Sequence, residues 1–410
     1  MASTKTYFEI PAKMKTWSFG LMAVGILAFI IGFVTKGMSS DHEQQKIFWG
    51  TIMYNAVYFL LITNISMFFI CILTLGMSGW QVALKRVPEA ISAAVPVFGT
   101  IAGVLLIGIV VSNVHIYEWT NMEEVRASKS LSYKHGFLNV PFFSLWTIAT
   151  IGLWILLGKR MRKLSDEADT ENFNADLNKG QSYIWRNTAN AAMFVAWFAL
   201  TAGCVTPWFW QMSLDVHWTS TMYSWYTFAS SFVGGLGLIT LFFIYLKNKG
   251  YLELANHEHL HDLGKFLFAF SIFWTYIWFA QYMLIWYANI PEETVYFKER
   301  VQGAYKGLFF LNLIINFVCP ILILMSRPAK RNYTLVTFMA VLLVFGHWLD
   351  FYQMIMGSIS PKTVTMGWLD FGILALFTGI LIYTVGRALT KRPLTSKYHP
   401  FLKESIIHHT

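Results

Sequence analysis

Charged residues are scarce in this sequence. Asp, Glu, Lys and Arg make up only 13% of the 410 residues, whereas about a quarter of an average soluble domain is charged. Apolar residues account for 56% of the chain and aromatic residues for 17%. This composition excludes an ordinary soluble domain and indicates a protein whose helices lie in lipid.

Cysteine is almost absent, and the few cysteines form no redox motif. Cys71, Cys204 and Cys319 fall in three different apolar segments, and no two of them have C-x-x-C spacing. Haem c attachment needs C-x-x-C-H, and iron–sulfur clusters need runs of closely spaced cysteines. We therefore expect no covalently bound cofactor and interpret the three cysteines as packing residues.

Long apolar runs dominate the chain. A helix needs roughly 20 apolar residues to cross a hydrocarbon core of about 30 Å. Ten segments approach this length: 17–35, 50–77, 90–113, 139–158, 186–207, 224–246, 266–289, 305–325, 333–356 and 366–386. The first is longer than a signal-peptide core and no cleavage site of small residues follows it, so we expect a retained helix. The sequence predicts an all-α integral membrane protein with ten transmembrane helices.

The spans are expected to form a single membrane domain over 17–386, between tails at 1–16 and 387–410. The fourth and eighth spans end in the similar "LLGKRMRK" and "LMSRPAKR", and the fifth and ninth in "PWFWQM" and "LDFYQM". Basic helix ends and aromatic belts also produce such matches. We therefore advance as a hypothesis that helices 2–5 and 6–9 are two related four-helix bundles, with the first and last helices peripheral.

Basic residues are unevenly divided between the two sides of the predicted domain. The tails and the even-numbered loops share one side and hold 22 of the 31 Lys and Arg residues, against 9 on the other side. The positive-inside rule places both tails in the cytoplasm. The net charge of +9 is explained by inner loops that meet anionic lipid head groups, without nucleic acid as a partner.

Two ionisable residues lie within the ninth span, in "HWLDFYQMIM". His347 and Asp350 are one helical turn apart, so their side chains share a helix face. Counted from Tyr333 at 1.5 Å per residue, they lie roughly 21 and 26 Å along the helix, in its outer half. An ionisable residue at membrane depth is costly unless it is paired or hydrated, and it usually has a function. We predict a proton site here, with a structural pair as the alternative.

Other polar residues in the spans are candidates for a proton path to this pair. The inner group is His261 and Asp262, and the remaining candidates are Asn64, Asn312, Asn316, Thr275, Tyr276 and Asp370. Hydrogen bonds between helices also explain such residues. The outer loop with Asp215 and His217 contains no Lys or Arg and is a plausible exit.

Candidate quinone-binding residues lie near the outer surface. Asn113, His115 and Glu118 cluster after the third span, and Gln281 and Tyr282 lie in the outer part of the seventh. Carboxyl, imidazole and amide groups beside aromatic rings suit a quinol head group that must give up protons.

Two polar inner segments have weaker interpretations. In "NHEHLHDLGK", His257 and His261 share a helix face, but no third ligand is defined, so we expect no metal site and a solvated helix start. The acidic segment within 159–185 is predicted to be a solvated surface loop, with a docking site for a soluble subunit as the alternative.

Three longer motifs point to a family: "HDLGKFLFAFSIFWTYIWFAQYMLIWYANIPEE", "SLDVHWTSTMYSWY" and the tail "HPFLKESIIHH". Together they resemble the F membrane subunit of bacterial alternative complex III. That assembly is a quinol:cytochrome c oxidoreductase, and its two large membrane subunits are similar to the polysulfide-reductase membrane-subunit family. The resemblance covers essentially the whole chain.

The resemblance implies a fold, a location and partners. It implies two four-helix bundles plus peripheral helices in the bacterial inner membrane. The implied partners are a related C membrane subunit, an iron–sulfur subunit and multihaem cytochrome c subunits, with a terminal oxidase as a further partner. Haem c and iron–sulfur clusters would belong to these partners, and quinol or menaquinol to the complex.

We therefore expect a non-redox membrane subunit of a respiratory complex, acting as a scaffold and a proton path. One alternative is a subunit with its own quinone site. A further alternative is an independent proton-coupled secondary transporter, a class that typically has discontinuous helices at the midplane. The stretch from Phe266 to Asn289 contains no Gly or Pro, which disfavours the transporter.

Overall fold

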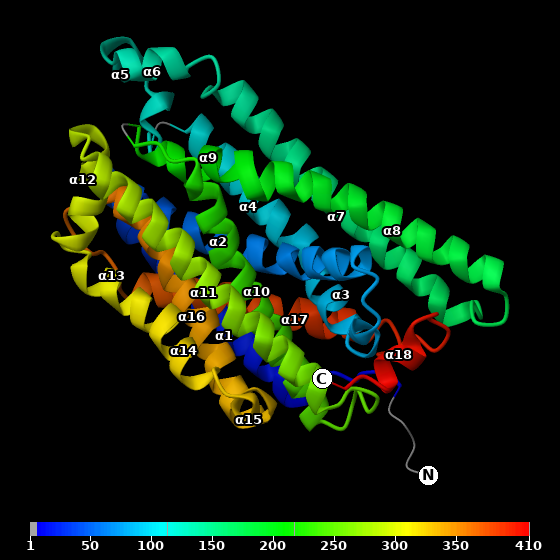
Figure 1. Ribbon diagram of the computed structural model, residues 1–410. Helices are drawn as coiled ribbons and strands as arrows, with labels where there is room; N and C mark the ends of the chain where they lie inside the picture. Colours follow the sequence, from blue (N-terminus) through cyan, green and yellow to red (C-terminus); the bar gives the residue numbers. More distant parts are fainter. Residues whose placement is uncertain (1–5, 113, 217, 410) are drawn as a thin grey trace.

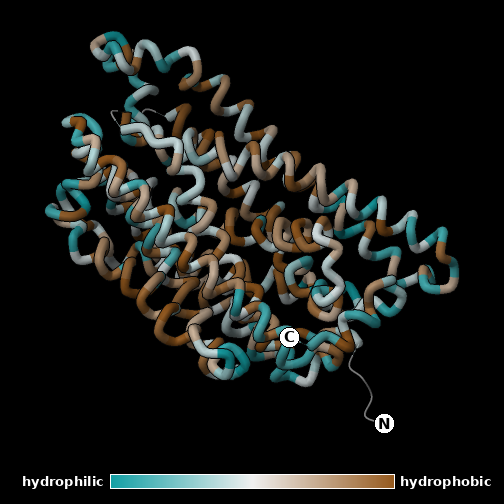
Figure 2. Tube along the Cα trace, viewed as in Figure 1, coloured by the Kyte–Doolittle hydropathy of each residue, from teal (hydrophilic) through white to brown (hydrophobic). Residues whose placement is uncertain are grey.

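The computed structural model describes residues 6–112, 114–216 and 218–409, and every regular element in these ranges is helical (Figure 1). Ten helical segments among them are long and apolar enough to cross a membrane, as the sequence predicts. Hydrophobic residues follow the length of these helices, and hydrophilic residues gather at their ends and in the connections (Figure 2). The chain is a multi-pass helical membrane protein.

The ten spans are built from long helices, some of them extended by short helical turns. In chain order they are α1 (Ala12–Gly32) with the π-helical turn η1 (Phe33–Gly37), α2 (His42–Leu75), α3 (Arg86–Ser92) with α4 (Val95–Val111), α7 (Val140–Thr170), α8 (Leu177–Leu200) with π-helical η4 (Thr201–Val205) and α9 (Thr206–Trp210), α10 (Met222–Asn248), α11 (His257–Ala288), α13 (Lys306–Leu313) with π-helical η6 (Ile314–Val318) and α14 (Cys319–Ile323), α16 (Tyr333–Ile359) and α17 (Trp368–Leu389).

The remaining helices lie in the connections and the C-terminal tail. They are η2 (Trp80–Ala83), η3 (Glu118–Thr120), α5 (Met122–Ala127), α6 (Lys129–Lys134), η5 (Met212–Leu214), α12 (Pro291–Val301), α15 (Arg327–Arg331) and α18 (Leu402–Ile406). In Figure 1, α5, α6 and α12 lie at one end of the molecule and α15 and α18 at the other.

Side-chain caps determine where several spans begin. Asp41, Asp176 and Asn256 each accept hydrogen bonds from backbone amides in the first turn of α2, α8 and α11. The sequence predicts these three helices to start at 50, 186 and 266. Those starts are too late, because the capped first turns are polar and resemble loops.

Neighbouring spans close into two four-helix groups. In the first group, α2 and α7 each pack against α4 and α8. In the second, α10 packs against α11 and α16, and the α13–η6–α14 span packs against both α11 and α16. The peripheral helices α1 and α17 pack along each other. The predicted groups of helices 2–5 and 6–9 therefore pack as two units. That the two units are related repeats stays a prediction.

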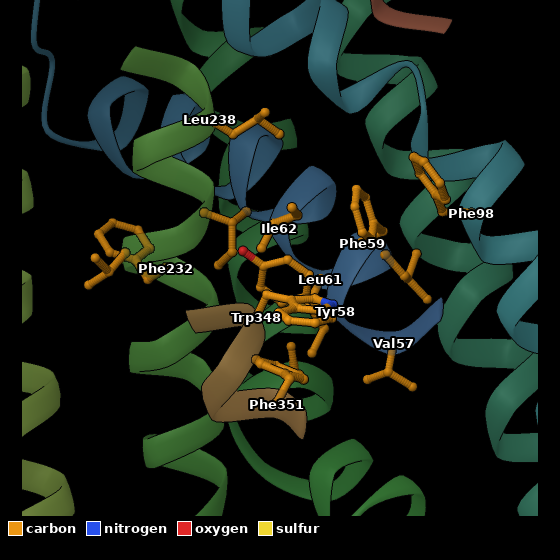
Figure 3. Close-up of a cluster of buried hydrophobic side chains, with 14 of the residues drawn as sticks. Val57, Tyr58, Phe59, Leu61, Ile62, Phe98, Phe232, Leu238, Trp348 and Phe351 are labelled. Carbon is orange, nitrogen blue, oxygen red and sulfur yellow. The ribbon is translucent and has the colours of Figure 1, made fainter. Parts of the chain in front are cut away.

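Helices α2 and α10 form the centre where the two groups meet. In the most apolar stretch of each, 89% of the residues are buried, against 22% in the stretch that includes α1. Figure 3 shows the aromatic and aliphatic side chains that fill this contact. Gly235 of α10 allows the close approach, because a Cβ there would lie 3.0 Å from the carbonyl oxygen of Ile62.

The acidic segment at 159–185 is solvated only in part: residues 170–179 are largely exposed, as predicted, but the residues before them are helical and partly buried. Helix α7 continues to Thr170, and its carboxylates meet buried arginine. Arg86 donates to Glu89 at 2.8 Å and to Asp166 at 3.3 Å, and it also pairs with Asp169. Arg392 of the C-terminal tail donates to Asp166 at 2.7 Å. These five residues, named here the inner ion cluster, join α3, α7 and the tail.

The two tails pack together against the same end of the helices. The backbone amide of Leu394 donates to the carbonyl of Thr6 at 2.9 Å. Further along, Ser405 donates to the carbonyl of Trp80 at 2.6 Å. His399 is buried between these points, and burial, followed by the nearby charges of Lys85 and Arg86, holds its pKa well below the ordinary value. The C-terminal tail is therefore an ordered part of the membrane domain.

The inner ion cluster predicts a large loss of stability for Arg86→Met. The substitution leaves Glu89 and Asp169 without their shared cation, and breaking a buried ion pair costs about 3–5 kcal/mol. We expect the melting temperature of the detergent-purified protein to fall by several degrees. The matched control is Lys179→Met, which removes an exposed ion pair with Glu171 and is expected to leave the melting temperature unchanged. Equal melting temperatures for the two variants would contradict the cluster's role.

Candidate proton site

A buried carboxylate lies inside the second four-helix group. Asp350 of α16 is 0% exposed, and three side chains donate hydrogen bonds to it. Tyr226 donates to Oδ1, Ser230 donates to Oδ2 at 2.7 Å, and the Trp274 indole donates to Oδ2 at 2.9 Å. Tyr226 and Ser230 belong to α10 and Trp274 to α11, so three helices assemble the site.

His347 belongs to the same site. Its Nδ1 atom lies 3.0 Å from the hydroxyl of Ser230 and 4.0 Å from Oδ2 of Asp350. If Ser230 donates to Asp350, it accepts from Nδ1–H of His347, which leaves Nε2 as a proton acceptor. That Nε2 atom is buried and has no hydrogen-bond partner among the residues described. Ser230 therefore links two groups that can each bind a proton.

Close helix packing holds the site in place. Tyr226 and Ser230 are four residues apart and lie on one face of α10. Two turns further, Gly237 brings α10 against α16, since a Cβ there would lie 3.2 Å from the carbonyl oxygen of Ala340. The Trp274 ring packs edge-on against the imidazole of His347, with ring centroids 5.6 Å apart. The carboxylate is thus surrounded by rigid donors rather than by lipid.

Amide side chains continue this polar site along α16. Asn312 donates to Gln353 at 2.7 Å, and Gln353 lies one turn beyond Asp350 on the same helix. In the other direction, Asn316 lies against Gly346, where any Cβ would collide with its amide oxygen. Asn316 is 0% exposed, and neither of its amide atoms has a hydrogen-bond partner in the described part of the chain. The predicted Asn312 and Asn316 therefore lie next to the proton site.

Asp370 is explained by a structural role. It caps the start of α17 by accepting from the amide of Gly367 at 2.9 Å. It also accepts from the hydroxyls of Tyr54 at 2.9 Å and Thr51 at 3.3 Å, both on α2. Asp370 thus joins α2 to α17, and none of these hydrogen-bond partners bonds to Asp350.

The other predicted path residues differ in placement. Thr275 follows Trp274 and donates to the carbonyl of Ser271 at 2.9 Å. Tyr276 is 64% exposed on the outer surface of the bundle, so its predicted place in an interior path is wrong. Asn64 is buried in α2, and both of its amide atoms lack a partner among the residues described.

The predicted solvated helix start is confirmed at His257, which is exposed, but the inner group one turn later is buried. His261 is 5% exposed and Asp262 is 4% exposed. Asp262 pairs with Lys265 at 2.5 Å and lies 2.6 Å from Nε2 of His408 in the tail. A search of the described residues finds no group of three or more metal-binding side chains.

The predicted quinone-binding residues do not share one cavity among the described residues. Nδ1 of His115 lies 3.1 Å from the hydroxyl of Thr120, and Glu118 is exposed. Tyr282 packs edge-on against Phe297. Gln281 alone of the four lines an outer cavity of about 440 Å³, together with residues that include Trp208 and Glu293. Asn113 and His217 lie outside the described residues.

Three residues of the site are not among those predicted from the sequence. Tyr226, Ser230 and Trp274 carry no charge, and each is common in membrane helices. The spacing of Tyr226 and Ser230 is a usable signal, because two hydroxyl groups on one helix face suit a buried carboxylate. Nothing in the sequence identifies α16 as the helix that this face meets.

Comparison with known proteins assigns no family. No protein-family model matches the chain, and a search of curated proteins finds no similar sequence.

Proposed function

We propose that this chain is an integral membrane subunit of a respiratory quinol:cytochrome c oxidoreductase of the alternative complex III type, where it acts as a scaffold and carries a proton path. The observation that supports the path is Asp350, a fully buried carboxylate with three donors and a neighbouring histidine. The resemblance of the long sequence motifs supports the complex, with a C membrane subunit, an iron–sulfur subunit and multihaem cytochrome c as partners.

The proposed path begins at the inner group and ends near the outer surface. Protons enter at His261 and Asp262 and pass along α11 towards Trp274. At 1.5 Å per residue, Asp262 and Trp274 are about 18 Å apart along the helix. Ser271 lies between them, and its hydroxyl is buried without a partner in the described ranges. Water must bridge these gaps, and the amides of Asn312 and Gln353 continue the path beyond Asp350.

Membership of a complex is tested by what purifies with the chain. We expect the N-terminally tagged protein, extracted in a mild detergent, to elute with c-type haem in one size-exclusion peak, since partner subunits would carry the haem. The haem is measured by its reduced-minus-oxidised absorbance, and an untagged strain provides the control. A single chain without haem would contradict the complex and favour an independent transporter.

The proton path predicts a specific effect of Asp350→Asn in the complex. The substitution keeps the size of the side chain and removes its titration. We expect proton release per quinol to fall more than quinol turnover falls, as measured in reconstituted vesicles. Tyr226→Phe is the matched variant, because it removes one donor but keeps the carboxylate, and it should retain more proton release. Unchanged proton release in Asp350→Asn would leave Asp350 as a structural contact.

A second candidate function is a quinone site in this chain, and the outer cavity favours it. Gln281 lines that cavity, is 4% exposed, and has an amide nitrogen without a partner in the part of the chain described. Gln281 and Trp274 are seven residues apart on α11, about 10 Å, so a quinol there would lie two helical turns from the tryptophan that donates to Asp350. If this chain has a quinone site, Gln281→Leu is expected to lower quinol turnover. The proton-path proposal does not predict that loss.

The proposal also places both tails in the cytoplasm. Tyr133 on α6 is 90% exposed and Leu177 at the start of α8 is 78% exposed. The long helix α7 lies between them in the chain, so they are at its opposite ends. We expect a membrane-impermeant thiol reagent to label Tyr133→Cys in intact cells and Leu177→Cys only after the membrane is opened. The unmodified chain, with its three native cysteines, is the background control. The reverse labelling pattern would overturn the orientation.

A further inference from the structure

An apolar groove lies between the peripheral helices and the centre of the molecule. It has a volume of about 760 Å³ and is lined by α1, α2, α10, α16 and α17. Several of its lining residues appear in Figure 3: Tyr58, Phe59, Ile62, Leu238 and Trp348. The hydroxyl of Tyr58 already donates to the carbonyl of Val344 at 2.6 Å. The deep part of the groove therefore offers mainly hydrocarbon and aromatic surface.

The charged residues that line this groove, among those described, are both basic. They are Lys13 near the start of α1 and Lys249 just after α10, and both are exposed. None of the salt bridges in the described ranges includes either lysine. By contrast, Lys247 donates to the backbone carbonyls of Leu252 and Ala255. Lys13 and Lys249, which form no salt bridge in the described ranges, therefore lie at one end of the groove.

The length of the groove matches one leaflet of a bilayer. From Lys249 to Leu238 the lining of α10 covers about 16 Å at 1.5 Å per residue. Half of a hydrocarbon core of about 30 Å is close to this length. The two lysines lie at the end of the helices where the chain tails pack, at the level expected for lipid head groups.

We propose that this groove holds one anionic phospholipid. Its acyl chains fill the apolar lining between α1 and the α10–α16 pair, and its phosphate contacts Lys13 and Lys249. Charge complementarity selects this occupant over a neutral quinone, because ammonium groups at the membrane surface attract anionic head groups. The lipid would attach the α1–α17 pair to the second four-helix group. This proposal is independent of the proposed function.

Native mass spectrometry of the purified protein, with any subunits that stay bound, tests the site. Phosphatidylglycerol and phosphatidylcholine with identical acyl chains are added in competition. We expect a preference for phosphatidylglycerol that falls about 30-fold in the Lys13→Ala/Lys249→Ala variant, since each lysine near an anionic head group contributes about fivefold in affinity. The matched control is Lys15→Ala/Lys391→Ala, which removes the same charge from residues outside the lining.

A second variant tests the groove itself. Thr378 lines the groove on α17, and Thr378→Trp places a large ring within it. We expect this variant to lose the bound phosphatidylglycerol. The proposal is overturned if wild-type protein binds the two lipids equally, or if the double lysine variant keeps the preference. It is also overturned if Thr378→Trp removes a bound quinone while phospholipid binding persists.

Discussion

Hydrogen bonding to one buried carboxylate is the constraint on which the second four-helix group depends. A carboxylate at membrane depth has no bulk water to solvate it, so protein donors must replace that solvation. Tyr226, Ser230 and Trp274 supply those donors from two helices. Their short side chains and rigid rings reach Asp350 only if α10, α11 and α16 lie close together. The hydrogen bonds to Asp350 therefore form only when these three helices pack closely.

Glycine makes this close packing achievable, and it does so in two directions. Gly237 brings α10 against α16, where the carboxylate lies, and Gly235 brings α10 against α2 of the first group. Helix α16 also has two functional faces. His347 and Asp350 point towards α10 and α11, whereas Trp348 donates to Asn55 of α2 at 2.9 Å and lines the apolar groove. A displacement of α16 would disturb the candidate proton site and the groove together.

The ten spans could be predicted from the sequence because length and hydropathy directly reflect the thickness of the membrane. Their starts could not, because Asp41, Asp176 and Asn256 cap polar first turns that resemble loops. His347 and Asp350 could be found because a charge is rare in a span, but their uncharged partners could not. Tyr276 illustrates the converse error: it follows Thr275 in the chain, yet it points to the outside of the bundle.

Incompletely bonded polar groups near Asp350 support the proposed proton transfer over a purely structural role. Asp370, like Asp350, has both oxygens accepting hydrogen bonds, and its side-chain donors Thr51 and Tyr54 have no unpaired polar atom among the described residues. Near Asp350, in contrast, Nε2 of His347 and both amide atoms of Asn316 are buried without partners in the described ranges. A buried polar atom left unpaired costs about 1–3 kcal/mol, so selection for stability alone would remove such atoms. Unpaired atoms also occur elsewhere in the described ranges, for example both amide atoms of Asn64. Those beside Asp350 support the proposed relay because of their position, since a relay needs acceptors next to the carboxylate that are not permanently occupied.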